Sequence, residues 1–413
     1  MQYRRISVIG LGYIGLPTAT MFANSGVDVI GVDVTARIVD TINSGRAHFG
    51  EPDLDALLDK AVKAGKLRAT LKPEPAEAFI IAVPTPFKND KQPDLSYIEA
   101  AGKSIAPVLA KGNLVVLEST SPVGATEQLT AWLAAARPDL KFAGPGVDAP
   151  DIHMTYCPER VLPGKIIQEL VENARTVGGI TPDCAARAAA LYQIFVKAEC
   201  RTTTARTAEM AKLTENSFRD VNIAFANELS IICDRLGIDV WELRKIANLH
   251  PRVNILEPGA GVGGHCIAVD PWFIVAAAPD EARLIRTARE VNDHKPHFII
   301  EKVQAACAQL GRNPTIACFG LAYKPDVDDL RESPAIEIVA TLAAKKMGTI
   351  LAVEPHVETL PGTLTQAGVE HVTQEEALTR ADVLVLLVDH TPFRHIAPPL
   401  RHGKIVVDAR GIW

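Results

Sequence analysis

The chain has 413 residues, 47% of them hydrophobic, with a formal net charge of −6 and an isoelectric point near 6.0. This length is more than one hydrophobic core supports, so it predicts two or three domains. The acidic balance without a basic run excludes nucleic acid as an expected partner, and no apolar stretch is long enough to predict membrane insertion. Seven scattered cysteines with no Cys-x-x-Cys pair indicate reduced thiols in a cytoplasmic protein, and the histidine spacing predicts no metal site.

The first part of the chain alternates short apolar strands with helix-like segments. The expected strands are RISVIG, VDVIGVD, AFIIAV and NLVVLEST, at residues 5–10, 27–33, 78–83 and 113–120. The expected helices include 14–24, 96–110 and 124–136. Continuously apolar strands that alternate with helices are typical of a parallel sheet covered on both faces.

The hydrophobic period changes near residue 206. A helical pattern continues over about 206–236, and further helices without strands are expected at about 239–248 and 281–310. The alternation then returns, with strands expected at 315–323, 349–355, 381–393 and 403–411 and a helix at about 333–346. The sequence therefore predicts an α/β protein with two doubly wound domains, at 1–203 and 311–413, joined by a long central helix and a helical middle domain at 204–310.

A glycine motif follows the first expected strand and opens a helix. GLGYIG, at residues 10–15, fits Gly-x-Gly-x-x-Gly in the context that a dinucleotide-binding turn requires. Gly10 makes the tight turn, Gly12 admits the pyrophosphate, and Gly15 lets the helix pack on the strand. The N–H groups at the start of this helix favour phosphate binding. The motif predicts a Rossmann domain, and the cofactor contacts expected in it include Tyr13 and Ile14.

An acid and three threonines extend this expected cofactor site. Asp33 ends the second strand, where its carboxylate can bind both ribose hydroxyls and would repel a 2′-phosphate, so NAD is favoured over NADP. VPTPF and ESTSPVGAT each follow a buried strand, and ligands bind beyond the carboxyl ends of parallel strands. Thr85, Thr120 and Thr126 are therefore expected to offer hydroxyls to the cofactor, although proline and threonine also serve simply to shape loops.

Cys266 stands in an unusual setting, GAGVGGHCIAVDPWF at 259–273. The glycines before it carry no Cβ, so a substrate or a phosphate can approach the backbone closely. An ordinary thiol is only slightly ionised at pH 7, and a nearby cation would increase the reactive thiolate fraction. Asp270 is placed to bind a water or a lysine. We expect Cys266 to be catalytic, whereas a small buried hydrophobic role suits the other six cysteines.

The long expected helix carries a polar stripe. Lys212, Asn216 and Arg219 follow one another at i, i+4 and i+7, on one helical face. A lysine and an amide that converge on a carbonyl oxygen would form an oxyanion site. The alternative is an ordinary solvated face, in which Arg219 pairs with Glu215 on its own helix.

Several sequence motifs together resemble those of the nucleotide-sugar 6-dehydrogenases, the UDP-glucose/GDP-mannose dehydrogenase family. They are GLGYIG, AEMAKLTENSF at 208–218, GVGGHCIAVDPWF at 261–273 and YKPDVDDLRESPA at 323–335, and the likeness runs from residue 5 to the C-terminus. Three further phrases are similar to the branch of that family that acts on UDP-2-acetamido sugars: YCPERVLPG at 156–164, NLHPRVNIL at 248–256 and VDARGIW at 407–413.

The resemblance implies a four-electron oxidation that uses two NAD⁺. The 6-hydroxymethyl of a UDP-2-acetamido sugar, expected to be UDP-N-acetyl-D-mannosamine, becomes a carboxylate for cell-surface polysaccharides such as enterobacterial common antigen. Cys266 would capture the intermediate aldehyde as a thiohemiacetal, which is oxidised to a thioester and then hydrolysed. Covalent capture would prevent loss of the aldehyde.

The resemblance also implies roles for matched residues. Lys212 would exchange the proton and bind the oxyanion with Asn216, while Asp270 and Glu159 would order the hydrolytic water. Residues implied to contact the sugar and its diphosphate, besides Lys212 and Asn216, are Arg160, Val161, Arg219, His250 and Gly263. Tyr323, Lys324 and Arg410 would contact UDP in the last domain. Arg331 would reach the NAD pyrophosphate, or alternatively pair with Asp328 or Asp329. The middle domain would form a homodimer, in which Arg252 reaches the partner's substrate.

One departure from the family pattern bears on the substrate. UDP-glucose dehydrogenases carry a second glutamate four positions after the one that matches Glu159, and this chain has Pro163 there. UDP-glucose is therefore a less favoured alternative, and UDP-N-acetylglucosamine, which differs only at C2, stays open. The rival interpretations are a two-domain hydroxy-acid dehydrogenase and an NAD-binding regulatory protein without catalysis.

Overall fold

The computed structural model describes residues 3–88, 91–264 and 266–413. The chain forms two compact units, residues 1–214 and 215–413, and each is described by itself. The boundary between them falls inside the long helix α8 (Ala205–Leu236). The division into three domains at 203/204 and 310/311 stays a prediction.

An eight-stranded sheet forms the centre of the N-terminal unit, in the order β3-β2-β1-β4-β5-β6-β7-β8. All neighbouring strands are parallel except β6 and β7. The strands are β1 (Arg5–Ile9), β2 (Asp28–Val32), β3 (Leu67–Thr70), β4 (Ala78–Ile81), β5 (Leu114–Leu117), β6 (His153–Tyr156), β7 (Arg175–Gly179) and β8 (Cys200–Thr204).

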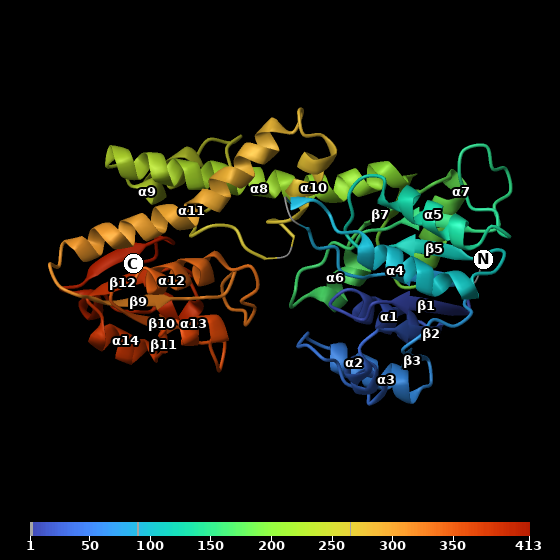
Figure 1. The fold of residues 1–413 in the computed structure, drawn as a ribbon, viewed down its shortest axis with the longest axis horizontal. Helices are drawn as coiled ribbons and strands as arrows, with labels where there is room; N and C mark the ends of the chain where they lie inside the picture. Colours follow the sequence, from blue (N-terminus) through green and yellow to red (C-terminus); the bar gives the residue numbers. More distant parts are fainter. Residues whose placement is uncertain (1–2, 89–90, 265) are drawn as a thin grey trace. The chain divides into compact units, whose positions relative to one another are not determined.

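Helices cover both faces of this sheet, as Figure 1 shows. One face packs on helices that include α1, α3, α6 and α7, and the other packs on α4 and α5 and on the first turn of α8. Their bounds, with α2 and the short 3₁₀ helix η2, are α1 (Gly15–Asn24), α2 (Ala36–Asn43), α3 (Leu54–Lys63), α4 (Ser96–Ile105), η2 (Ala106–Val108), α5 (Ala125–Ala136), α6 (Ile166–Glu172) and α7 (Pro182–Tyr192). Because both faces are covered, β4 and β5 are apolar and buried throughout.

The C-terminal unit begins with the second part of α8 and continues through three helices without a strand. They are α9 (Val240–Ala247), α10 (Asp270–Ala277) and α11 (Arg283–Ala308). A buried polar cluster ties α8 to α11: the Asn292 side-chain amide donates to Asp220 Oδ1 at 2.8 Å, and the Arg289 guanidinium donates to the same oxygen at 2.6 Å.

A five-stranded parallel sheet completes this unit, in the order β11-β10-β9-β12-β13. The strands are β9 (Thr315–Phe319), β10 (Thr349–Val353), β11 (Glu370–His371), β12 (Val383–Leu386) and β13 (Ile405–Asp408). The remaining helices are α12 (Pro334–Ala344), α13 (Gly362–Gln366), α14 (Gln374–Arg380), α15 (Thr391–Arg394) and the 3₁₀ helix η3 (Pro398–Arg401). α11 and α12 pack on one face, and α14 and α15 pack on the other.

The predicted fold class is confirmed: two doubly wound α/β sheets, a long central helix and a helical segment are all present. The sequence patterns missed β3, β6, β7, β8 and β11, and they missed α10, which begins four residues after Cys266. β8 has the sequence CRTTT and lies half-exposed or exposed along its length, so it lacks the apolar run that marked the other strands.

Candidate active site

The glycine motif forms the expected turn at the end of β1. Gly10 has φ +91°, and its N–H donates to the Val32 carbonyl at 2.8 Å. A Cβ at Gly15 would lie 1.8 Å from the Gly10 carbonyl oxygen, so the helix start needs glycine there. Around Gly12, in contrast, no heavy atom would lie within 4 Å of an added Cβ. This open position beside a helix N-terminus fits the pyrophosphate of NAD.

The residues around this turn also fit the cofactor. Asp33 is half-buried, and its Oδ2 accepts the Leu11 N–H at 3.2 Å while Oδ1 accepts the Thr35 N–H at 2.9 Å. These bonds fix the carboxylate next to the turn and leave it partly accessible to ribose hydroxyls. Tyr13 is exposed and stacks on Phe49 at 4.2 Å, and Ile14 is the residue before α1.

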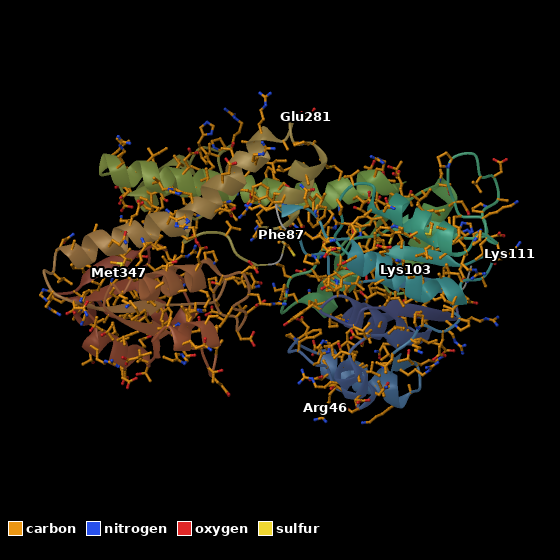
Figure 2. All side chains as sticks on the ribbon, in the orientation of Figure 1. Arg46, Phe87, Lys103, Lys111, Glu281 and Met347 are labelled. Carbon is orange, nitrogen blue, oxygen red and sulfur yellow. The ribbon has the colours of Figure 1, made fainter. Side chains whose placement is uncertain are left out.

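The loops after β4 and β5 are joined to each other. The Thr85 hydroxyl donates to the Thr120 carbonyl at 2.5 Å, and the Ser119 hydroxyl donates to the Val83 carbonyl at 2.7 Å. Phe87, labelled in Figure 2, ends the first loop and is exposed. Thr85 thus joins the two loops in this structure. Its contact with the cofactor, like that of Thr120, stays a prediction.

Thr126 lies in the first turn of α5 and bonds with the central helix. Its N–H and its hydroxyl donate to Glu209 Oε1 at 2.8 Å and 2.7 Å, and the Gly124 N–H donates to Glu209 Oε2 at 2.6 Å. A carboxylate therefore already satisfies this helix N-terminus. The sequence did not single out Glu209, which stands three residues before Lys212 and ties α8 to the NAD-binding sheet. Lys212 is itself buried in the same unit.

Glu159 belongs to a buried charge cluster. Arg175, on β7, is 3% exposed, and its Nη2 lies 2.6 Å from Glu159 Oε2. Its Nη1 lies 3.3 Å from Glu118 Oε1, which also accepts the Tyr192 hydroxyl at 3.0 Å. The Arg160 N–H donates to Glu159 Oε1 at 2.8 Å. Glu159 is therefore held as one of two carboxylates around a buried guanidinium, and its action on the hydrolytic water stays a prediction.

The cluster changes the acidity of its members. Burial raises the pKa of Glu118 to about 7, although Arg175 acts in the opposite direction. Burial also raises the pKa of the neighbouring Cys157 thiol to about 12, so this cysteine is not a nucleophile at neutral pH. No local motif signals Arg175 and Glu118, because only the folded sheet brings this pair together.

Arg160 and Val161 follow Glu159 in the loop after β6. The Asn173 side-chain amide donates to the Arg160 carbonyl at 3.0 Å, and the Arg160 guanidinium bonds with the Ala174 carbonyl. Val161 packs on the hydrophobic core of the sheet. Both residues are half-buried, and their predicted sugar contacts are untested.

The glycines before Cys266 make room for the chain itself. A Cβ at Gly263 would lie 2.4 Å from the Glu332 carbonyl oxygen and 2.7 Å from Pro334 Cδ. A Cβ at Gly264, which has φ +84°, would touch the Tyr323 ring at 3.1 Å. The expectation that these glycines leave space for substrate is therefore revised: the loop after β9 fills that space. A substrate contact through the Gly263 backbone stays a prediction.

Two further contacts fix the start of the same segment. Asn227 of α8 accepts the Gly259 N–H at 2.9 Å. Arg410, which follows β13, donates from Nη1 to the Pro258 carbonyl at 3.1 Å and from Nε to Asp389 Oδ1 at 2.7 Å. The segment that leads to the cysteine is thus fastened to both the central helix and the C-terminal sheet.

Cys266 is exposed and lies four residues before Asp270, the first residue of α10. Its carbonyl accepts the Asp270 N–H at 2.8 Å, and the Asn216 amide donates to Asp270 Oδ2 at 2.5 Å. The structure therefore brings Asn216, Asp270 and the cysteine segment together within the C-terminal unit. Lys212 belongs to the other unit, so its approach to Cys266 stays a prediction. His265 lies outside the described residues.

The other predicted ligand residues lie on α8 and on loops and turns of the C-terminal unit. The Tyr323 N–H donates to the Asp329 carbonyl at 3.1 Å, and Lys324 Nζ lies 5.7 Å from the Tyr323 ring centre. Arg331 donates to both Asp329 carboxylate oxygens, at 2.8 Å and 2.7 Å, which is the alternative pairing that the sequence allowed. The exposed residues Arg219, His250 and Arg252 lie on α8 and on the turn after α9.

Comparisons with known proteins cover the whole chain. The NAD binding domain of the UDP-glucose/GDP-mannose dehydrogenase family matches residues 4–196, the central domain matches 206–294, and the UDP binding domain matches 317–413. A Rossmann sheet with NAD-type glycines, a central helix and a UDP-binding sheet define an NAD-dependent UDP-sugar dehydrogenase. The chain belongs to the UDP-glucose/GDP-mannose dehydrogenase family.

Individual relatives are similar over their full length. NDP-N-acetyl-D-galactosaminuronic acid dehydrogenase of Ralstonia nicotianae is 62% identical over 413 residues, which cover 100% of this chain and 97% of the relative. UDP-N-acetyl-D-mannosamine dehydrogenase of Escherichia coli K12 is 58% identical over 421 residues, which cover 100% of both chains. The structure of UDP-D-ManNAc dehydrogenase from Pyrococcus horikoshii superposes with a TM-score of 0.89 at 39% identity, over 99% of this chain and 96% of that one.

Because the chain belongs to this family, it is neither a two-domain hydroxy-acid dehydrogenase nor a non-catalytic NAD-binding regulator. Among the helices of the described residues, none combines the length and the apolar character that crossing a bilayer requires.

Proposed function

We propose that the chain oxidises UDP-N-acetyl-D-mannosamine at C6 to the uronate, with Cys266 as the nucleophile. The observation that carries the proposal is the position of the cysteine segment, which packs through its glycines on Tyr323 and Pro334 beside the UDP-binding sheet. A UDP group held by that sheet would keep its sugar within reach of an exposed thiol. The relatives named for UDP-N-acetyl-D-mannosamine support this sugar.

The Gly10–Gly15 turn would hold NAD⁺, which would supply the hydride acceptor for both oxidations at C6. Lys212 would take the hydroxyl proton and then bind the developing oxyanion with Asn216. Cys266 sulfur would add to the aldehyde carbon, and loss of the second hydride would leave a thioester. Asp270, held by Asn216, would orient the water whose oxygen displaces the sulfur, so that the products are a carboxylate, two NADH and released protons.

A second candidate substrate has its own support. The Ralstonia relative, at 62% identity, is named for an N-acetyl-D-galactosaminuronic acid product. N-acetylmannosamine and N-acetylgalactosamine differ in configuration at both C2 and C4, and the described contacts contain no group that reads either centre directly. We favour the mannosamine substrate because it is named both for the Escherichia coli relative, 58% identical, and for the Pyrococcus horikoshii structure, with a TM-score of 0.89.

A parallel assay distinguishes the substrates. NADH formation is measured with UDP-N-acetylmannosamine, UDP-N-acetylgalactosamine, UDP-N-acetylglucosamine and UDP-glucose at equal concentrations. We expect the highest kcat/KM with the first, and two NADH for each sugar consumed. A kcat/KM that is equal or higher with UDP-N-acetylgalactosamine would reject the mannosamine assignment, and a high rate with UDP-glucose would contradict our interpretation of Pro163.

We also infer that the enzyme is a cytoplasmic homodimer. Phe218, Phe225, Ile232 and Leu236 of α8 are 71%, 53%, 45% and 64% exposed. Their spacing of seven, seven and four residues places them on one face of the helix, where a second copy of this chain would cover them. In that assembly Arg252 is the residue proposed to reach the partner's substrate.

Light scattering after size exclusion tests the dimer. Phe225→Glu places a charge in the proposed contact and is expected to give monomers at micromolar concentration. Leu284→Glu is the matched control, because Leu284 is also exposed, at 68%, but lies on α11. A wild-type monomer, or a dimer that Phe225→Glu leaves intact, would reject this surface.

A further inference from the structure

The first two strands of each sheet follow the same chain path, but the acid after the second strand has different surroundings in the two sheets. The Gly10 N–H donates to the Val32 carbonyl at 2.8 Å, and the Gly320 N–H donates to the Val353 carbonyl at 2.9 Å. Both glycines have positive φ, +91° and +84°. The turn after β9 is therefore built like the dinucleotide turn after β1, although its sequence, GLAYKP at 320–325, lacks the Gly-x-Gly-x-x-Gly motif.

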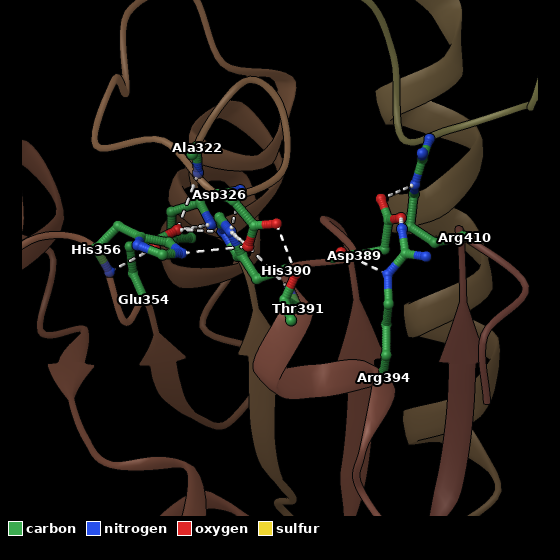
Figure 3. A network of polar contacts seen from close by, with 10 residues as sticks. Ala322, Asp326, Glu354, His356, Asp389, His390, Thr391, Arg394 and Arg410 are labelled. Atoms are coloured by element: carbon green, nitrogen blue, oxygen red, sulfur yellow. Dashed lines mark hydrogen bonds and ion pairs between the residues drawn. The ribbon is translucent and has the colours of Figure 1, made fainter. Parts of the chain in front are cut away.

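The acid that follows the second strand of each repeat differs in its surroundings. Asp33 is half-buried and is placed for a ribose. Glu354, its counterpart after β10, is 3% exposed. Glu354 Oε2 accepts the Leu321 N–H at 2.7 Å and the Ala322 N–H at 3.0 Å, and it lies 3.0 Å from His390 Nε2 (Figure 3). Protein donors thus occupy the carboxylate that a dinucleotide site would offer to the ribose.

His390 comes from a loop that is longer than its N-terminal counterpart. The loop after β4 reads VPTPF and the loop after β12 reads VDHTPF, with one residue more before Thr-Pro-Phe. The buried His390 ring accepts the Asp326 N–H at Nδ1 over 2.9 Å. Its other nitrogen is therefore the protonated one, and it donates to Glu354.

The loop that carries His390 also binds Asp326, further along the loop after β9. Asp326 has φ +58°, and its carboxylate accepts the N–H and the hydroxyl of Thr391 at 2.8 Å and 2.7 Å. Glu354 thus holds the loop at 321–322 and His390 holds it at 326. Tyr323 and Lys324, the predicted UDP contacts, lie between these two points.

We propose that Glu354 and His390 are positioning residues of the UDP-sugar site, which fix the loop 321–326 and do not contact the nucleotide. The proposal rests on UDP binding by the C-terminal unit and is independent of which sugar is oxidised. Burial alone would raise the pKa of Glu354, but the bonds from His390 and from backbone N–H groups outweigh it and hold the pKa below its ordinary value. An ionised Glu354 strengthens each of these bonds.

A metal site is the competing explanation of this cluster. Asp326, His356 and His390 offer ligand atoms within 4.8 Å of one another. However, both ring nitrogens of His390 already take part in hydrogen bonds with the protein, so a metal would have to break one of them. We therefore attribute the cluster to loop positioning, and the experiment includes a metal measurement.

The experiment measures inhibition of the full-length enzyme by UDP and by 2′-deoxy-UDP. In Glu354→Gln and His390→Phe, both inhibition constants are expected to rise together, by about tenfold, because the loop loses a charge-assisted bond. The ratio of the two constants and the KM for NAD⁺ should not change. His390→Gln, which keeps an N–H donor, should recover part of the affinity, and His356→Asn is the matched control, with wild-type affinity.

Three outcomes of the inhibition and metal measurements would overturn the proposal. A UDP to 2′-deoxy-UDP ratio that collapses in Glu354→Gln would show direct ribose contact. Unchanged inhibition constants in both variants would show that the loop needs no such support. Stoichiometric zinc in the wild-type enzyme, lost in His356→Asn, would show a metal site.

If a variant is too unstable for kinetics, the proposal requires faster hydrogen exchange of the Leu321 and Ala322 amides in His390→Gln, and wild-type exchange there would reject it. Because UDP alone is the probe, a wrong sugar assignment does not affect these results.

Discussion

Cys266→Ser is expected to lower carboxylate formation by at least about 10³-fold, since a serine hydroxyl ionises far less readily than a thiol and forms no thioester. NADH formation is measured at saturating UDP-sugar and NAD⁺. Quenched wild-type enzyme should carry a sugar adduct on Cys266 in mass spectra, and the variant should carry none. The thiol is exposed, and Gly264, two residues before it, lies against the Tyr323 ring.

A second cysteine variant separates loss of the nucleophile from general damage. Cys200→Ser changes a half-buried thiol on β8 and should leave kcat within about twofold of wild type. Iodoacetamide should modify Cys266 in the wild-type enzyme, and UDP-sugar should slow that reaction. A Cys266→Ser enzyme with more than about a tenth of wild-type kcat would remove the covalent mechanism from consideration.

The sequence predicted the positions of most strands because buried parallel strands are apolar throughout. β4 and β5 are AFII and LVVL, buried at every residue. β8 was missed because its polar residues carry no such signal. The dinucleotide turn was predicted in detail, since Gly10 and Gly15 are required by the local backbone, which a short motif records.

Other parts of the site depend on residues far apart in the chain. The hydroxyl of Thr126, whose contact with the cofactor stays a prediction, donates to Glu209, 83 residues further on. The glycines before Cys266 were attributed to substrate access, but the groups that fill the space, Tyr323 and Pro334, come from the last domain. A sequence pattern shows that a position needs a small residue, and only the fold shows which atoms lie beside it.

Arg175, a buried cation of the NAD-binding unit, gives the largest expected effect on stability. Arg175→Met leaves Glu118 and Glu159 without the guanidinium between them and is expected to destabilise this unit by about 3–5 kcal/mol at pH 8. The loss should be smaller at pH 5.5. Burial already raises the pKa of Glu118 to about 7, well above its value in an unfolded chain, so the folded state holds this proton more tightly. The resulting stabilisation is complete below about pH 4.5 and is lost as the pH rises through about 7.

Removing Arg175 takes away the charge that opposes this rise, so the pKa of Glu118 increases further and the ionised cluster becomes more costly. Urea unfolding followed by hydrogen exchange of the β7 amides at pH 5.5 and pH 8 measures the effect in this unit alone. Arg201→Met is the matched control: Arg201 lies on the neighbouring strand, in register with Thr176, and its ion pair with Glu199 is exposed. That variant should lose less than about 1 kcal/mol at either pH. A similarly small, pH-independent loss in Arg175→Met would mean that the two carboxylates do not depend on this cation, and Glu159 would then be available for the chemistry of the loop.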